Sequence, residues 1–194
     1  MIEKADEYKA LIKQRLRPER YQHSLNVADE ALELAVRYDA DTEKAYICGL
    51  LHDVMKNSST DEQLALINKA GIILPEVENK NPKLWHAPAG AAYIKLELGI
   101  DDRDMFNAIM YHTTARAGMS ILEKIIYTAD YVSAERDYPG VEVMREKAHE
   151  DINEAILEGT RYALSDILSR RRQVNKNTVE AYNEMCRLSA AEGK

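Results

Sequence analysis

The sequence predicts an all-α protein folded as a single helical bundle. Apolar residues recur at helical spacing along the chain, and no stretch shows the sustained apolar–polar alternation of a half-buried strand. Prolines number only five among 194 residues, and phenylalanine occurs once. No internal repeat, low-complexity tract or Gly- and Ser-rich linker divides the chain. We therefore expect one domain over residues 1–194, with a core of about 18–185.

Helices in the first half are predicted from apolar periodicity combined with residues that start or stop a helix. Proline suits the first turn, an Asp such as Asp41 or a Ser caps the amino end, and glycine ends a helix. A Ser followed three residues later by Glu is the pattern of a capping box. The helices expected on these grounds cover residues 2–16, 18–38, 41–53, 59–71 and 88–99. Residues 73–82 are expected to form a loop, with His86 on a short helical turn after it.

The second half of the chain carries the same kinds of signal. Asp101 or Asp102 is placed to start a helix that bears His112 near its end. A capping box at Ser120 starts the helix that bears Asp130. After a loop at residues 137–140, one long helix is expected to about residue 172, and the pair Asn177 and Glu180 is expected to begin the last helix.

Net charge and chain composition narrow the partners and the compartment. The formal net charge is −7, whereas a protein that follows a nucleic-acid backbone normally carries a basic patch. The amino-terminal residues lack the apolar run of a signal peptide, and no run approaches the ~18 apolar residues of a membrane span. Cys48 and Cys186 suggest no disulfide framework. We expect a cytoplasmic protein with neither nucleic acid nor membrane as a partner.

Four of the five histidines lie at or near predicted helix ends or turns, and they are His23, His52, His86 and His112. Asp53 follows His52 directly. Asp130 interrupts an apolar segment, where a buried carboxylate is costly unless it is paired or bound to a metal. The remaining histidine, His149, lies on a charged helix and is expected to be solvated.

These four imidazoles and two carboxylates form a mixed N/O set that favours Fe, Mn, Ni or Zn over Ca or Mg. Six ligands exceed what one catalytic metal with open positions would use, but they suit two metals that share one carboxylate. Such a pair can bridge a hydroxide and hold a phosphoryl group for in-line attack. Any one of these residues alone is more often structural or solvated. Cys48, one turn before His52, is expected to be a small buried hydrophobe rather than a ligand.

The ordered set His23, His52-Asp53 and Asp130 resembles the H…HD…D signature of the HD superfamily of metal-dependent phosphohydrolases. His86 and His112 match the subset that holds two metals. More closely, the chain resembles the bacterial YqeK family, the symmetrical bis(5′-nucleosyl)-tetraphosphatases. The segments that carry this resemblance are RYQHS (residues 20–24), LLHDVMK (50–56), LWHAP (84–88), YHTT (111–114), KIIYTADY (124–131), Arg136, Pro139-Gly140 and TVEAYN (178–183).

Two segments depart from the pattern of that family. The family often has Glu-Pro after Ala-Asp-Tyr-Ile, where this chain reads Val132-Ser133-Ala134-Glu135. It often has His-Pro before the last helix, where this chain reads Asn175-Lys176. Neither change falls on a metal position.

The resemblance implies an HD fold, a di-iron site and hydrolysis of diadenosine tetraphosphate to two ADP. By position, His23, His52, Asp53 and Asp130 would hold one metal, and Asp53 would bridge to a second completed by His86 and His112. A hydroxide bridging the metals would attack a central phosphorus. Catalytic roles are expected for Asp53, Lys56 and Arg136. Nucleotide contacts (an ADP- or GDP-like ligand) are expected from Arg20, Asp53, Lys56, His86, His112, Asp130, Tyr131, Arg136, Asn175 and Thr178.

Local cations are needed because a polyphosphate must bind to an acidic protein. Arg20 lies one helical turn before His23, Lys56 one turn after His52, and Arg136 beyond the helix of Asp130. We expect all three to contact phosphate, although each taken singly is more often an exposed charge.

Two alternatives stay open from the sequence. An HD phosphohydrolase could act on another nucleotide, such as a nucleoside monophosphate, a dNTP or a guanosine alarmone. A ligand-sensing or scaffold domain without turnover is disfavoured, because all six ligand positions are filled. A homodimer formed through an apolar face of the first or last helix also stays open.

Overall fold

The computed structural model describes residues 2–192, and every regular element in that range is helical. The predicted all-α class is therefore confirmed. The single-domain boundary of 1–194 stays a prediction, and Met1 and residues 193–194 lie outside the described residues. The helices are α1 (Ile2–Arg15), α2 (Pro18–Arg37), α3 (Thr42–Leu51), α4 (Thr60–Lys69), α5 (Glu76–Asn79), α6 (His86–Leu96), α7 (Arg103–Tyr111), α8 (Ile121–Val132), α9 (Val141–Glu150), α10 (Ile152–Ser169) and α11 (Lys176–Glu192), with a 3-10 turn, η1 (Pro82–Leu84), before α6.

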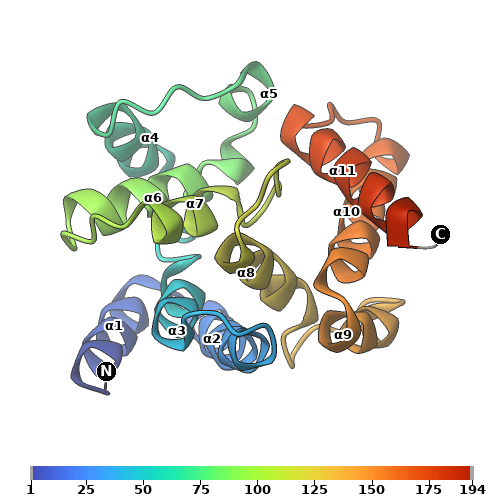
Figure 1. The fold of residues 1–194 in the computed structure, drawn as a ribbon. Helices are drawn as coiled ribbons and strands as arrows, with labels where there is room; N and C mark the ends of the chain where they lie inside the picture. The colour runs from blue at the N-terminus through green and yellow to red at the C-terminus, as the bar shows by residue number, and fades with distance from the viewer. Residues whose placement is uncertain (1, 193–194) are drawn as a thin grey trace.

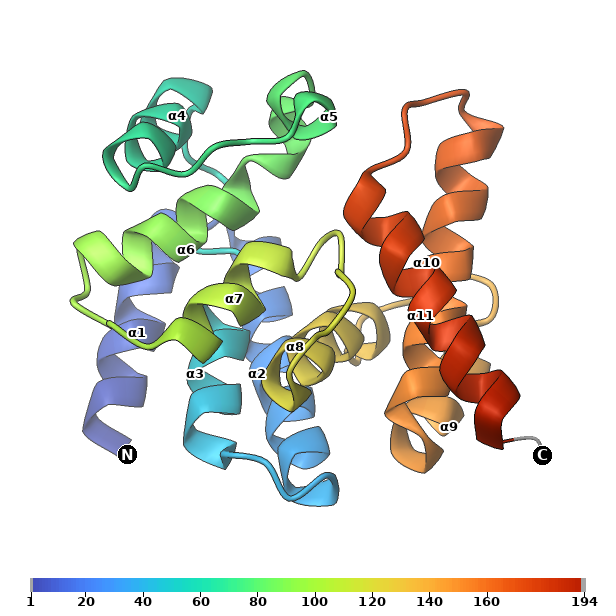
Figure 2. The same ribbon diagram turned by 45° about the horizontal axis from the view of Figure 1, so that its top comes forward.

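The helices are arranged around α8, which lies near the middle of the molecule (Figures 1 and 2). Helices α2, α3 and α7 pack against α8 from one side, and α9 and α10 pack against it from the other. Helices α4 and α6 form a further layer, and α11 lies along α10. The first helix, α1, and the last, α11, lie on opposite sides of the molecule in both views. Among residues 2–192, no helix is both long and apolar enough to cross a membrane.

Local capping explains where several helices begin. The Asp41 carboxylate accepts a hydrogen bond from Lys44 N at 3.0 Å, and the Ser59 hydroxyl accepts one from Glu62 N at 3.2 Å. At Ser120 both halves of the predicted capping box form with Glu123. Each cap satisfies backbone N–H groups that have no partner within the helix.

Four predictions of the secondary structure are wrong. The predicted loop at residues 73–82 contains α5, and α6 begins at His86 rather than at Pro88. The predicted long helix is two helices, because Asp151 is extended (φ −148°, ψ 110°) and its carboxylate accepts from Asn153 N. The last helix begins before Asn177, whose backbone N donates to Asn175 Oδ1 at 2.8 Å. At both places the side chain of an Asp or Asn caps the helix that follows.

One cluster of buried apolar side chains runs from Ile12 in α1 to Met185 in α11. Within it, α2 and α3 approach most closely at Gly49, where a Cβ atom would lie 2.5 Å from Ala28 Cα. Only a residue without a side chain allows the two helix backbones this distance. The contact brings the carboxyl end of α3, which carries His52, next to α2, which carries His23. Both residues are predicted metal ligands.

Candidate metal centre

The structure brings together all six residues predicted to bind metal, from five different helices or their ends. His23 lies in α2, Asp130 in α8, and His86 is the first residue of α6. His52 and His112 are the residues that cap the carboxyl ends of α3 and α7. Asp53 follows His52 in a tight turn, in which its carbonyl accepts from Lys56 N at 2.8 Å.

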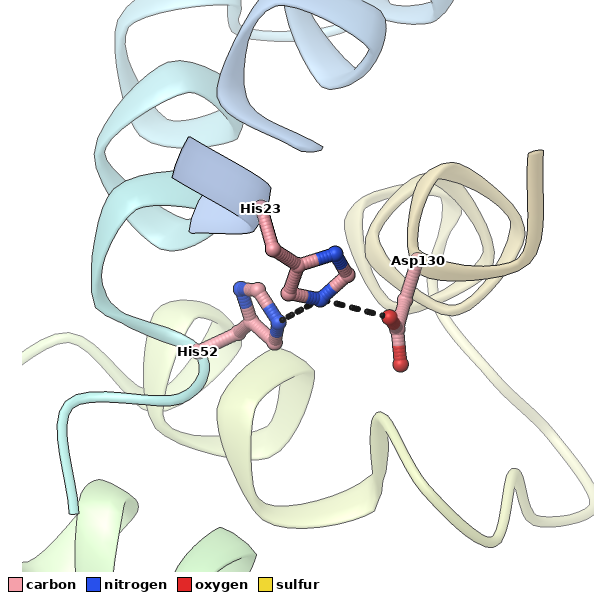
Figure 3. Close-up of side chains that lie close together, drawn as sticks. All are labelled: His23, His52 and Asp130. Atoms are coloured by element: carbon pink, nitrogen blue, oxygen red, sulfur yellow. Dashed lines mark hydrogen bonds and ion pairs between the residues drawn. The ribbon is translucent and has the colours of Figure 1, made fainter. Parts of the chain in front are cut away.

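Figure 3 shows one half of the cluster, with His23 between His52 and Asp130. Nε2 of His23 lies 3.0 Å from Asp130 Oδ1 and 3.2 Å from Nε2 of His52. Oδ2 of Asp53 lies 3.7 Å from Nε2 of His52 and 4.0 Å from Nε2 of His23. Four potential ligand atoms therefore converge on one small volume.

The other half of the cluster surrounds the second oxygen of Asp53. Oδ1 of Asp53 lies 3.3 Å from Nε2 of His86 and 3.6 Å from Nε2 of His112. The His112 ring is edge-on to His52, with centroids 5.0 Å apart, and to His86, with centroids 5.2 Å apart. The two oxygens of a single carboxylate thus face two different sets of imidazoles, which is the arrangement that a bridging ligand requires.

Hydrogen bonds fix the orientation of three of these rings. Nδ1 of His52 lies 2.7 Å from Gly49 O, Nδ1 of His86 lies 2.9 Å from Lys83 O, and Nδ1 of His112 lies 2.8 Å from Ile109 O. A carbonyl oxygen can only accept, so Nδ1 carries the proton in each ring. With Nδ1 as the donor, Nε2 is the ring nitrogen left to coordinate a metal, and in all three rings it faces the centre of the cluster.

The donor set and its burial fit a divalent metal. The side chains of His52, Asp53 and His112 are almost completely buried. Oδ1 of Asp53 and Nε2 of His112 have no hydrogen-bond partner among the described residues, although both atoms are buried. Leaving such atoms unpaired is costly, and a cation between them would satisfy both. Imidazole and carboxylate donors together suit transition metals.

The protonation of the cluster also suits metal binding. Burial lowers the pKa of His52 to about 4 and that of His86 to about 3, so both rings are neutral at pH 7. Burial alone would raise the pKa of Asp53, but His52 and the other positive or polar neighbours hold it well below its usual value. These two histidines are thus in the form that coordinates a metal, and Asp53 is ionised.

The three predicted cations lie at the edge of the cluster. Nη1 of Arg20 lies 3.0 Å from Asp53 Oδ2, and Nζ of Lys56 lies 2.9 Å from Nε2 of His86. Nε of Arg136 donates to Asp130 O at 2.7 Å, and its guanidinium pairs with the carboxylate of Asp130. About a third of each side chain is exposed, at 31%, 31% and 33%. Each cation therefore touches both the cluster and the solvent.

Next to Asp130 and Arg136 the surface opens into a cavity of about 580 Å³. Tyr131, a predicted nucleotide contact, lies in its wall. The cavity is lined by Thr113, Asp130, Tyr131, Glu135, Arg136, Asp137, Tyr138 and Tyr162. Its volume is within the range of ligand sites, about 300–1,000 Å³. Tyr138 and Tyr162 were not predicted, because nothing local marks a residue of the loop before α9, or a residue of α10, as a neighbour of Tyr131 in α8.

Asn175 and Thr178 are placed differently from the other predicted nucleotide contacts. Both are buried and do not line this cavity. Asn175 Nδ2 donates to Glu78 Oε1 at 2.7 Å, and Thr178 Oγ1 donates to Thr114 O at 2.8 Å. These bonds fasten the start of α11 to preceding segments, and a nucleotide contact by either residue stays a prediction.

Glu135 contacts the cluster through His23. It was not predicted as a site residue, and it stands in one of the two segments that depart from the family pattern. One carboxylate oxygen is hydrogen-bonded to Nδ1 of His23, and the other accepts from Asn26 Nδ2 at 2.6 Å.

The two residues that were expected not to bind metal lie as predicted. Cys48 is fully buried, and the side chain of His149 is 45% exposed.

Comparison with known proteins agrees with this geometry. The model of the HD domain family matches residues 20–135, which include all six members of the cluster. The chain belongs to the HD domain family, which confirms the family that the motifs predicted.

Relatives within that family cover almost the whole chain. It is 37% identical over 178 residues to the symmetrical bis(5′-nucleosyl)-tetraphosphatase of Bacillus subtilis (strain 168), covering 92% of this chain and 95% of the relative. It is also 37% identical over 175 residues to the protein of that name from Halalkalibacterium halodurans, covering 90% and 93%. A crystal structure from Clostridium acetobutylicum, described as a predicted HD superfamily hydrolase involved in NAD metabolism, superposes with a TM-score of 0.90 at 39% identity, covering 93% of this chain and 96% of that one.

Proposed function

We propose that this protein is a metal-dependent phosphohydrolase that cleaves diadenosine tetraphosphate symmetrically into two ADP. The observation that carries the proposal is the two-sided environment of Asp53, whose oxygens face separate groups of imidazoles. The choice of substrate is supported by the relatives from B. subtilis and H. halodurans, which are symmetrical bis(5′-nucleosyl)-tetraphosphatases.

Two metals would be held on either side of Asp53. His23, His52 and Asp130 would complete one position, and His86 and His112 the other. When bound, two such ions supply Lewis acidity and a water of lowered pKa for attack on phosphorus. We propose iron as the resident metal on the strength of the family resemblance, and Mn, Ni and Zn suit the same donors.

The chain's own cations would bind the polyphosphate. Arg20, Lys56 and Arg136 stand around the cluster with part of each side chain in solvent, so a phosphate oxygen can replace or share their present carboxylate and imidazole partners. Lys56 and Arg136 would stabilise the charge that develops on the transferring group. A nucleoside would occupy the cavity beside Asp130, where Tyr131 provides an aromatic surface.

Product identification tests this proposal. The metal-loaded protein is incubated with diadenosine tetraphosphate, and the products are separated by ion-exchange chromatography. Two ADP are expected from each molecule of substrate, and the Asp53→Asn variant should release no ADP. The appearance of AMP and ATP would contradict symmetrical cleavage. Turnover of a nucleoside monophosphate, a dNTP or a guanosine alarmone in preference to the dinucleotide would identify another nucleotide phosphohydrolase.

A further inference from the structure

His23 differs from the other three histidines in what holds its Nδ1 atom. In His52, His86 and His112, the partner of Nδ1 is the carbonyl oxygen of the residue three positions earlier. In His23 the partner is the carboxylate of Glu135, 112 positions away along the chain. One imidazole of the cluster is therefore oriented by a side-chain anion, and three are oriented by neutral backbone groups.

The position of His23 in its helix explains this difference. His52 and His112 lie at carboxyl ends of helices, where the helical hydrogen-bond pattern stops and carbonyl groups become free. His86 follows a 3-10 turn, which leaves Lys83 O available. His23 lies inside α2 rather than at or near a helix end as predicted, and the preceding carbonyls there already accept bonds from backbone N–H groups. Its Nδ1 proton therefore needs an acceptor from another part of the chain.

Glu135 is itself held in place to meet this ring. It lies in the segment between α8 and α9. Asp130, near the end of α8, contacts Nε2 of the same ring. Ser133 Oγ donates to Oε1 of Glu135 at 2.8 Å, and Asn26 Nδ2 donates to Oε2 at 2.6 Å. Asn26 lies one turn after His23 on the same helix. Both carboxylate oxygens are thus hydrogen-bonded, and these bonds hold the Glu135 side chain against His23.

We propose that Glu135 is a positioning residue for the metal site, which fixes the proton of His23 on Nδ1 and strengthens Nε2 as a ligand. Its anionic carboxylate polarises the imidazole more than a carbonyl does. The effect is confined to the metal position that His23 forms with His52, Asp53 and Asp130. The position formed by His86 and His112 is not affected. The inference rests on the metal site of the proposed function and does not depend on its substrate.

Metal titration of variants tests this inference. The metal-free protein is titrated with Co²⁺, followed by visible absorption and by isothermal calorimetry, and the wild type should show two binding events. Glu135→Ala should weaken one event by about 10–100-fold and leave the other unchanged, as expected for loss of an outer-shell partner. Glu135→Gln keeps an acceptor oxygen without the charge, so it should show a smaller loss. Glu97→Gln, which removes a surface partner of Lys69 far from the site, is the matched control and should bind as the wild type does.

The outcomes separate this inference from the proposed function. Two unchanged events in both Glu135 variants, or equal weakening of both events, would overturn the role of Glu135 and leave the metal site standing. A wild type that binds no metal would overturn both. Thermal unfolding of the metal-free variants reports whether they fold. If Glu135→Ala does not fold, Glu135→Gln alone decides, and a wild-type affinity for both events would refute the charge effect.

Discussion

The close approach of α2 and α3 at Gly49 allows one perturbation to be worked out from the structure. In Gly49→Ala, the new Cβ would lie 2.5 Å from Ala28 Cα, 2.9 Å from Ala28 N and 3.0 Å from Val27 O. All three are backbone atoms and cannot rotate away, so the helices must separate by about 1 Å to restore ordinary van der Waals contact. Overpacking of this kind costs about 1–3 kcal/mol, and the helix-favouring effect of alanine offsets roughly 0.5–1 kcal/mol of it.

The same separation should disturb the metal site. Gly49 O orients His52, whose Nε2 is 3.2 Å from that of His23 on the opposing helix. Metal–ligand distances tolerate only about ±0.2 Å, so a shift of about 1 Å should weaken metal binding at this position.

Urea unfolding of the metal-free protein and Co²⁺ titration measure the two effects. Gly159→Ala is the matched control, because its Cβ would meet the flexible end of Met144 at 2.8 Å and the Tyr127 ring at 3.2 Å, with no metal ligand among its contacts. We expect Gly49→Ala to lower both stability and metal affinity, and Gly159→Ala to leave metal affinity unchanged. A Gly49→Ala protein with wild-type stability and wild-type affinity would refute this account of how α3 positions His52.

Four further predictions concern the cluster itself. Asp53→Asn keeps the shape of the side chain but removes the charge that both halves of the cluster share. Metal content, measured by elemental analysis, and ADP release should therefore be lost together. Lys56→Ala should lower kcat by about 10²–10³-fold with metal content intact; loss of metal instead would assign Lys56 a structural role. Chelation with EDTA should abolish hydrolysis, and added Mn²⁺ or Fe²⁺ should restore it; activity that survives chelation would contradict a metal mechanism. In the metal-free protein, the pKa values of His52 at about 4 and His86 at about 3 lie below the value of about 6.5 in an unfolded chain. The unfolded chain therefore takes up more protons between pH 6.5 and 4, so the free energy of unfolding should fall as the pH decreases, by up to about 1.4 kcal/mol per pH unit for each ring. The raised pKa of His23 acts mainly above pH 6.5, outside this window. Urea titrations across that window measure this slope, and a constant midpoint would contradict it.

Features encoded locally could be predicted from the sequence. The caps at Asp41 and Ser120 involve residues three positions apart, and both form as predicted. The break at Asp151 was missed, because an aspartate in a charged segment fits a helix surface as well as it fits a cap. The candidate metal cluster could be predicted because four of its six members are histidines, of which the chain has five, and because all six stand in a recognisable order along the chain.

Partners that are distant in sequence could not be predicted in this way. Glu135 meets His23 because α2 and α8 pack together, and Gly49 is needed because α3 lies on α2. The sequence around Glu135 does not distinguish it from exposed glutamates elsewhere. The sequence around Gly49 does not distinguish it from other glycines inside helices. Tertiary packing gives each its role, so only the folded structure reveals it.

The central claim is that Asp53 joins two metal positions. Anomalous diffraction from crystals of the metal-loaded protein tests it most directly, since each bound transition metal gives its own peak. We predict two peaks roughly 3.5–4 Å apart, one beside His23 and Asp130 and the other beside His86 and His112, with one Asp53 oxygen facing each. A single peak, or peaks that Asp53 does not contact, would contradict the claim.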